Sequence, residues 1–265
     1  MAELFDLELR AMRRDRAERC GVEPFLYRRA LDDCLERLEL FERGFDQALL
    51  IGCLDPAAVE AVARQVGSLD VRDPSSLVAR IAGGEQLNEE AWEFAPGAYD
   101  LIIAIGTLDT VNALQLVLRL MRSALRDDAL LLGAISGGET LPRLRTAMRA
   151  ADAVEGAASP HVHPRIEAAA LAPLLADAGF VRPVVDIDRV SVRYRNLSAL
   201  IADLRAMGAT NVLVERPRRG LTRRALAAAT AEFAAAGDGE RTTETFEILH
   251  FAAWTPAQPL SVTGR

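Results

Sequence analysis

The first part of the chain has apolar residues at helical spacing. Leu31, Leu35 and Leu38 recur at intervals of three or four residues, with charged residues between them, which is typical of a helix with one apolar face. The segment from Gly21 to Pro24 interrupts this pattern, so two helices are expected rather than one. We therefore predict that residues 1–43 form an amphipathic helical cover.

Short apolar runs alternate with helical stretches from residue 44 onwards. The run Leu101 to Ile105 contains no polar residue, as expected of a strand that is covered on both faces. Alternation of this kind predicts βαβ units around a parallel sheet, an α/β fold. The expected strands are Gln47–Cys53, Ser68–Val71, Tyr99–Ile105, Leu130–Ala134, Val184–Tyr194 and Thr245–Trp254, and the expected helices are Pro56–Val66, Asn112–Leu125, Thr140–Ala153, Glu167–Ala178, Leu197–Met207 and Thr222–Ala235.

The last two expected strands are separated by helical residues. We predict that residues 195–240 form a helical insertion between them. In the final strand Phe246 and Ile248 alternate with Glu247, which favours a half-exposed strand over a central one. No internal repeat is evident, so we expect residues 44–265 to form one domain and the whole chain to be a single structural unit.

The turn after the first strand is the most diagnostic point in the chain. In nucleotide-binding α/β folds this loop is rich in glycine, because it turns tightly with positive φ and a ligand approaches its backbone. Here Gly52 is followed by Cys53 and Leu54. Leu54 would cost roughly 1–2 kcal/mol in a left-handed conformation, and Pro56 has no amide hydrogen to donate to an anion. The sequence therefore predicts the fold together with an altered ligand loop.

Composition restricts the possible chemistry. The chain contains no lysine, so Schiff-base chemistry, a pyridoxal phosphate anchor and a Walker-type phosphate loop are excluded. The net charge of −7 disfavours nucleic acid as an obligate partner, since binding phosphates requires a concentrated basic surface.

Cysteine usage and hydropathy bear on the location of the protein. Cys20, Cys34 and Cys53 are too few and too scattered for a disulfide framework or for paired metal ligands. The first residues are acidic from Glu3 and do not match a signal peptide. Since no apolar run approaches the ~20 residues of a membrane span, we predict a cytoplasmic protein.

Candidate ligand residues flank two of the expected strands. Asp73 closes the second strand, where an acid can bind a ribose hydroxyl pair, although its Asp-Pro-Ser context is also that of a turn and helix cap. Asn88 and Glu89 precede the strand that begins at Tyr99. A side chain in that place can accept a hydrogen bond from an adenine amine, and a solvated acidic loop is an equal alternative.

A further candidate is the segment His161-Val162-His163. Its two histidines share a side if the chain is extended, but Pro160 and Pro164 flank them and no third ligand follows at a suitable spacing, so no metal is expected. A loop that contacts a partner or substrate is preferred to an exposed turn.

No catalytic residue is assigned from the sequence. Neither a nucleophile elbow nor a pair of catalytic carboxylates stands out. The arginine clusters at residues 13–16 and 216–219 are interpreted as solvated faces.

Several longer segments resemble one family. They resemble class I S-adenosylmethionine-dependent methyltransferases, and within that class the methyltransferase-like assembly factors of respiratory complex I, which are known as arginine hydroxylases. The malonyl carrier-protein methyltransferases of biotin synthesis are similar at a greater distance. The segments are Phe5–Arg19, Glu89–Asp100, Ser136–Met148, Ser159–Val162, Leu174–Tyr194, Asp203–Asn211 and Thr245–Trp254, of which those in the C-terminal half are the most specific.

The resemblance implies a Rossmann-like, doubly wound sheet of seven mostly parallel strands with an antiparallel last strand. It implies that S-adenosylmethionine lies across the carboxyl ends of the first, second and fourth strands, with no metal. The implied cofactor ligands are Gly52, Cys53, Asp73, Asn88, Glu89, Ile105 and Gly106, and the implied substrate or partner residues are His161, His163 and Tyr194.

Some positions depart from the family pattern. Leu50 stands where the family has an acid that contacts the methionine moiety, and Asn88 replaces an aspartate. After the fourth strand the family usually has a His-Trp pair and a later acid. Asp109, Thr110 and Ala113 depart from that pattern.

Two functions from different classes follow from the resemblance. One is the modification of a protein side chain, by methylation or hydroxylation, with S-adenosylmethionine as cofactor and a role in respiratory complex assembly. The other is a non-catalytic assembly or protein-binding factor that keeps the fold without binding the cofactor. An NAD-dependent oxidoreductase is disfavoured because it depends on the same missing glycines.

Overall fold

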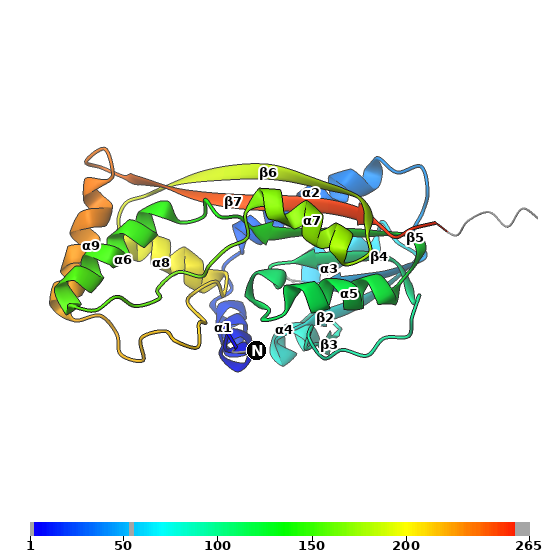
Figure 1. Cartoon of the computed structure of the whole chain (residues 1–265), viewed down its shortest axis with the longest axis horizontal. Helices are drawn as coiled ribbons and strands as arrows, with labels where there is room; N and C mark the ends of the chain where they lie inside the picture. The colour runs from blue at the N-terminus through cyan, green and yellow to red at the C-terminus, as the bar shows by residue number, and fades with distance from the viewer. Residues whose placement is uncertain (1–2, 53–55, 258–265) are drawn as a thin grey trace, which may run out of the picture.

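A sheet of seven strands forms the centre of the computed structural model, which describes residues 3–52 and 56–257 (Figure 1). Its strand order is β3-β2-β1-β4-β5-β7-β6. Neighbouring strands are parallel except for β7, which runs antiparallel to both β5 and β6. The predicted fold class, including the antiparallel last strand, is confirmed. The strands are β1 Gln47–Ile51, β2 Ser68–Asp73, β3 Glu85–Gln86, β4 Tyr99–Ile105, β5 Leu125–Ser136, β6 Val181–Tyr194 and β7 Thr242–Trp254.

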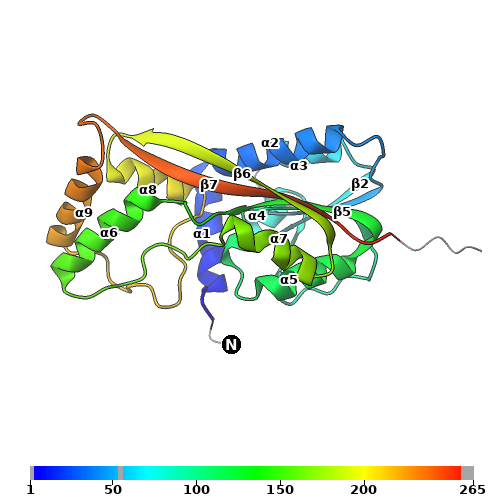
Figure 2. The ribbon, with the colours of Figure 1, turned by 45° about the horizontal axis from the view of Figure 1, so that its top comes forward.

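Helices cover both faces of the sheet, with α2 and α3 on one side and α5 and α7 on the other (Figure 2). In β4, Leu101 and Ile103 face the first layer, whereas Ile102 and Ala104 face the second. The uniformly apolar run of β4 follows from this double burial. The helices are α1 Leu7–Cys20, α2 Phe25–Glu39, α3 Pro56–Ala63, α4 Ser76–Ile81, α5 Leu114–Ala124, α6 Pro142–Glu155, α7 Ala168–Asp177, α8 Leu197–Ala206 and α9 Arg223–Ala235, with a short 3₁₀ turn at Leu108–Thr110.

The long strands β6 and β7 extend beyond the rest of the sheet and carry a group of helices, α6, α8 and α9 (Figure 1). The buried carboxylate of Glu244 attaches α6 to β7, because it accepts hydrogen bonds from the backbone amides of Arg143 and Leu144 at 3.2 and 2.8 Å. These amides belong to the first turn of α6, which has no capping side chain of its own. Desolvation raises the pKa of Glu244.

The predicted half-exposure of the final strand is wrong. Strand β7 lies between β5 and β6, and Leu249 is 0% exposed. Its polar residues are buried because they have partners, as in the 3.0 Å ion pair between Glu247 and Arg189. The exposed edge is instead β6, where Val184 and Ile187 are 51% and 49% exposed. The short elements α4 and β3 were not predicted.

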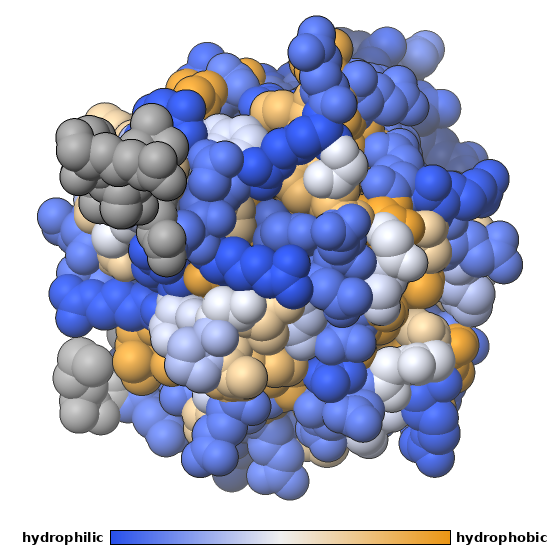
Figure 3. All heavy atoms as spheres, turned by 90° about the vertical axis from the view of Figure 1, so that its right-hand side faces the viewer, coloured by the Kyte–Doolittle hydropathy of each residue, from blue (hydrophilic) through white to orange (hydrophobic). Residues whose placement is uncertain are grey.

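The described surface at one end of the sheet is mainly polar. Viewed from the end of the sheet where β7 finishes, apolar residues form small areas among polar ones (Figure 3). None of the helices in the described ranges combines the length and the apolar character needed to cross a bilayer.

The central position of β7 can be tested at one register position. Leu249 pairs with Ile187 across β7 and β6. We expect L249A to lower the free energy of unfolding by roughly 3 kcal/mol, because it leaves a cavity in the core. The matched variant I187A, on the exposed edge, should lower it by less than about 1 kcal/mol. Urea denaturation measures both, and equal losses would contradict the strand order.

Candidate functional site

Helix α1 lies at the carboxyl ends of the central parallel strands, against α4 (Figure 1). Asp6 caps its first turn by accepting a hydrogen bond from the Leu9 amide at 2.9 Å, and Gly21 ends it in a left-handed conformation. The two buried residues of α1 are not apolar: they are Arg10 and Arg14. The helix is therefore held at this edge of the sheet mainly through polar side chains.

Arg14 is paired with Asp73, the acid that was predicted to bind a ribose. The Arg14 Nε donates to Asp73 Oδ1 at 2.9 Å, and its Nη2 binds Asp73 Oδ2. Its Nη1 donates to the carbonyl oxygen of Gly106 at 3.0 Å. Asp73 is 0% exposed and also accepts a hydrogen bond from the Ser75 amide at 2.8 Å. Both carboxylate oxygens are thus satisfied by the chain itself.

Arg10 forms the equivalent pair one helical turn earlier. Its Nη2 lies 2.6 Å from Oε2 of Glu89, which is 0% exposed, and its Nη1 is 3.4 Å from the carbonyl oxygen of Thr107. Asn88, the neighbouring predicted ligand, is exposed instead, and its Oδ1 accepts from the Glu90 amide at 3.1 Å. Of the two predicted adenine-side residues, only Glu89 faces α1.

Gly52 and Gly106 lie very close to atoms of other parts of the chain. Gly52 has a φ of 89°, and a Cβ there would lie 1.9 Å from the carbonyl oxygen of Ile105. At Gly106, with a φ of 64°, a Cβ would lie 2.9 Å from the ring of Tyr27. The space that these glycines leave open is therefore filled by β4 and by α2. Cys53 and Leu54 lie outside the described residues.

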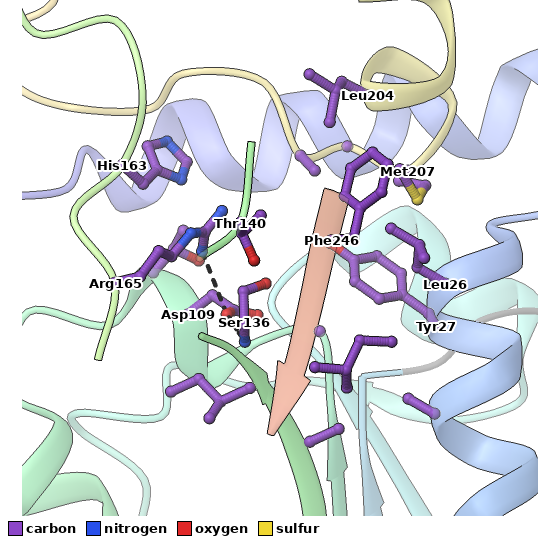
Figure 4. Close-up of a pocket in the computed structure, with 18 of the residues that line it drawn as sticks. Leu26, Tyr27, Asp109, Ser136, Thr140, His163, Arg165, Leu204, Met207 and Phe246 are labelled. Carbon is purple, nitrogen blue, oxygen red and sulfur yellow. Dashed lines mark hydrogen bonds and ion pairs between the residues drawn. The ribbon is translucent and has the colours of Figure 1, made fainter. Parts of the chain in front are cut away.

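A cavity of about 60 Å³ remains beyond Gly106 (Figure 4). Its apolar wall is formed by residues of α2, α8 and β7, namely Leu26, Tyr27, Leu204 and Phe246 together with Met207. Desolvation raises the pKa of Tyr27 to about 12, so its hydroxyl stays protonated at neutral pH.

The opposite wall of this cavity is polar. Arg165 Nη1 lies 3.2 Å from Asp109 Oδ1, and the same oxygen accepts from the Ser136 amide at 2.6 Å (Figure 4). Glu247 and Thr140 complete this wall. The cavity thus joins an apolar half to a half in which the charges are already paired.

The predicted partner residues separate in the structure. His163 is buried, its Nε2 accepts from the Val212 amide at 2.9 Å, and its ring packs edge-on against Phe5. Burial, with the nearby Arg165, lowers the pKa of His163 to about 3. His161 is paired with Asp152 at 2.7 Å. Tyr194 lines neither cavity that the histidines line: it is buried near Asp203, which together with burial raises its pKa.

The residues that fill the site were not found from the sequence. Arg14 falls in a cluster that was interpreted as a solvated face, and Arg10 and Tyr27 were not considered. One signal was available, because Arg10 and Arg14 lie four residues apart on one face of a helix whose sequence has no continuous apolar stripe.

The strand order, the antiparallel β7 and the two helical layers define the class I methyltransferase fold. Solved structures with this fold include the YcgJ protein of Bacillus subtilis, with a TM-score of 0.59, 11% identity and coverage of 85% of this chain and 97% of that one. The cyclase SpnF aligns with a TM-score of 0.51, 16% identity and coverage of 86% and 80%. At these identities the likeness concerns the fold alone.

Relatives found by sequence comparison identify a family within this fold class. The mitochondrial arginine-hydroxylase NDUFAF5 of Danio rerio is 31% identical over 229 residues, which cover 81% of this chain and 70% of the relative. The chain belongs to this methyltransferase-like family. The malonyl-[acyl-carrier protein] O-methyltransferase of Xylella fastidiosa is 37% identical over 173 residues, 63% of this chain and 56% of the relative.

These alignments do not extend over the whole of every relative. The chain spans about half, 49%, of the Mus musculus NDUFAF5, to which it is 34% identical. A search against models of known protein families finds no match.

The described residues do not fit S-adenosylmethionine in the conformation observed. The acid that was predicted to bind a ribose is bound to Arg14, Tyr27 covers Gly106, and the cavity beside Gly106 has a volume of about 60 Å³, well below the roughly 300–1,000 Å³ of ordinary ligand pockets. For a cofactor to bind Asp73, this carboxylate would have to be released by Arg14 of α1.

The pair between Arg14 and Asp73 should dominate the attachment of α1. We expect R14A to lower the free energy of unfolding by roughly 3–5 kcal/mol, because it leaves a buried carboxylate without its cation. The exposed neighbour Arg16 serves as the control, and R16A should change stability by less than about 0.5 kcal/mol. Urea denaturation of R14A, D73N and the double variant measures the coupling. Additive losses would contradict a direct pair.

The burial of His163 predicts a pH dependence of stability. Its pKa is about 3 in the folded chain and about 6.5 when unfolded, so between these values only the unfolded chain binds the proton. Stability from this residue should therefore fall by about 1.4 kcal/mol for each pH unit lowered in that window. Unfolding measured between pH 6.5 and pH 4.5 should show a smaller slope for H163Q than for the wild type. Equal slopes would show that His163 titrates normally.

Proposed function

We propose that this chain is a non-catalytic, protein-binding member of its family, which keeps the methyltransferase fold without binding S-adenosylmethionine. The observation that carries the proposal is the bidentate pair between Arg14 and the fully buried Asp73. A ribose offers neutral hydroxyls to this carboxylate, whereas Arg14 offers a charged and geometrically matched partner. Arg10 supports the same interpretation through its pair with Glu89.

The biological role we propose is the assembly of a respiratory complex through contact with a protein partner, in the cytoplasm. The support is the NDUFAF5 likeness. In this proposal residues 1–43 act as a built-in cover over the predicted cofactor residues Asp73, Glu89 and Gly106, with residues 44–265 as the domain that they cover. The altered loop after Gly52 agrees with a cofactor that is no longer bound.

A second candidate is a methyltransferase or a related S-adenosylmethionine-dependent enzyme that becomes active when α1 withdraws. One observation favours it: α1 buries two arginines rather than apolar side chains, so little apolar surface is exposed when it leaves. The small cavity beside Gly106 would then widen into the acceptor side. This candidate predicts measurable cofactor affinity, which the first does not.

Calorimetry with S-adenosylhomocysteine and S-adenosylmethionine separates the two candidates. For the wild type we expect no binding heat at millimolar ligand. The variant R10A/R14A, which removes both cations, should bind more tightly than the wild type provided that its fold is retained by circular dichroism. A micromolar midpoint for the wild type would overturn the non-catalytic proposal and support the enzyme.

A further inference from the structure

A second, larger cavity lies on the other side of the segment 161–165. It has a volume of about 370 Å³ and is open to the surface. We call it the arginine groove. Five of its lining residues are arginines and none is acidic: Arg13, Arg165, Arg205, Arg216 and Arg219.

The charge in the arginine groove is only partly balanced. Arg165 is paired with Asp109 at 3.2 Å and Arg216 with Asp6 at 3.1 Å. Across residues 3–52 and 56–257, no carboxylate forms an ion pair with Arg13, Arg205 or Arg219. In a chain whose net charge is −7, this local excess of positive charge marks a surface for an anion.

Two buried donors point to the same conclusion. The Nε atoms of Arg13 and Arg165 are buried and have no hydrogen-bond partner among the described residues. The side chain of Arg165 is only 7% exposed, so its guanidinium group is held by the surrounding protein rather than by solvent. Burial, together with the nearby cations of Arg216, Arg16 and Arg205, lowers the pKa of Arg13.

The floor of the arginine groove is apolar. Met148, Val162, Ile201 and Leu221 line it and remain partly exposed while they pack on the core. Its walls are fixed to each other, because Asn211 Nδ2 donates to the carbonyl oxygen of Pro160 at 2.7 Å and the Val212 amide donates to His163. A preformed apolar floor with a charged rim is typical of a protein-binding surface.

We propose that the arginine groove binds an acidic segment of a partner protein whose apolar side chain packs on the groove floor. The arginines come from α1, α8 and two separate loops, so they surround the floor rather than gather at one point. A single carboxylate would bind one or two guanidinium groups, whereas an acidic peptide supplies several carboxylates. The proposal deepens the proposed function, on which it rests, by naming the surface and the chemistry of the partner.

Fluorescence anisotropy with a labelled peptide of Glu-Glu-Leu repeats tests the arginine groove. We expect saturable binding to the wild type, weakened at high salt. The variant R205E/R219E changes two exposed residues and should weaken binding by about tenfold or more. The matched variant R80E/R119E alters the net charge equally at exposed residues outside the groove and should stay within about twofold.

Ligand controls identify the occupant. Peptides of Gln-Gln-Leu and Glu-Glu-Ser repeats, which lack the charge or the apolar side chain, should both bind more weakly than the Glu-Glu-Leu peptide. Equal loss in the two arginine variants would overturn the proposal, because binding would then reflect net charge. Binding of decanoate but not of the peptide would also overturn it, in favour of a small anionic amphiphile.

The outcome is distinguishable from that of the proposed function. If the peptide fails to bind while the cofactor titration is silent, the groove assignment is wrong and the non-catalytic proposal stands. If the peptide binds and the wild type also binds S-adenosylhomocysteine, the arginine groove stands and the non-catalytic proposal fails.

Discussion

The pair between Arg14 and Asp73 is the interaction on which the arrangement of this end of the molecule depends. Burying a guanidinium and a carboxylate costs several kcal/mol for each ion. That cost is offset only where the geometry is close, as it is here with two parallel bonds and an added bond to the Gly106 carbonyl. Helix α1 has no apolar stripe of its own, so its position is determined by its buried ion pairs.

The cleft at which a cofactor was predicted, which α1 closes, and the open arginine groove share a wall. Adjacent residues of α1 serve the two sites, since Arg14 reaches Asp73 whereas Arg13 lines the groove. The segment before α1 is attached to the loop after α8, because the Asp6 backbone amide donates to the Val212 carbonyl at 2.8 Å. A movement of α1 that opened the cleft would therefore also disturb the groove. The geometry couples the two sites through one helix.

The sheet could be predicted from the sequence because burial on both faces leaves a direct mark on composition. The apolar run from Leu101 to Ile105 belongs to β4, which has the predicted bounds Tyr99–Ile105. The exposure of β7 could not be predicted, since Glu247 looks like a surface residue until Arg189 is placed beside it. The same holds for Asp73, which the sequence located at the end of β2 but whose partner lies 59 residues earlier in the chain. Pairing between distant residues leaves no periodicity to detect.

The free energy of the pair between Arg14 and Asp73 affects how tightly a ligand can bind at this place. A ligand that takes the place of Arg14 must first break a buried ion pair, which costs roughly 3–5 kcal/mol. That cost weakens the apparent affinity by about two to four powers of ten. A nucleoside that an open cleft would bind with a micromolar constant would then need concentrations of roughly 0.1–10 mM. The class I fold can thus persist with one helix bound over the predicted cofactor residues, because the strands that build the sheet do not depend on the residues that fill the cleft.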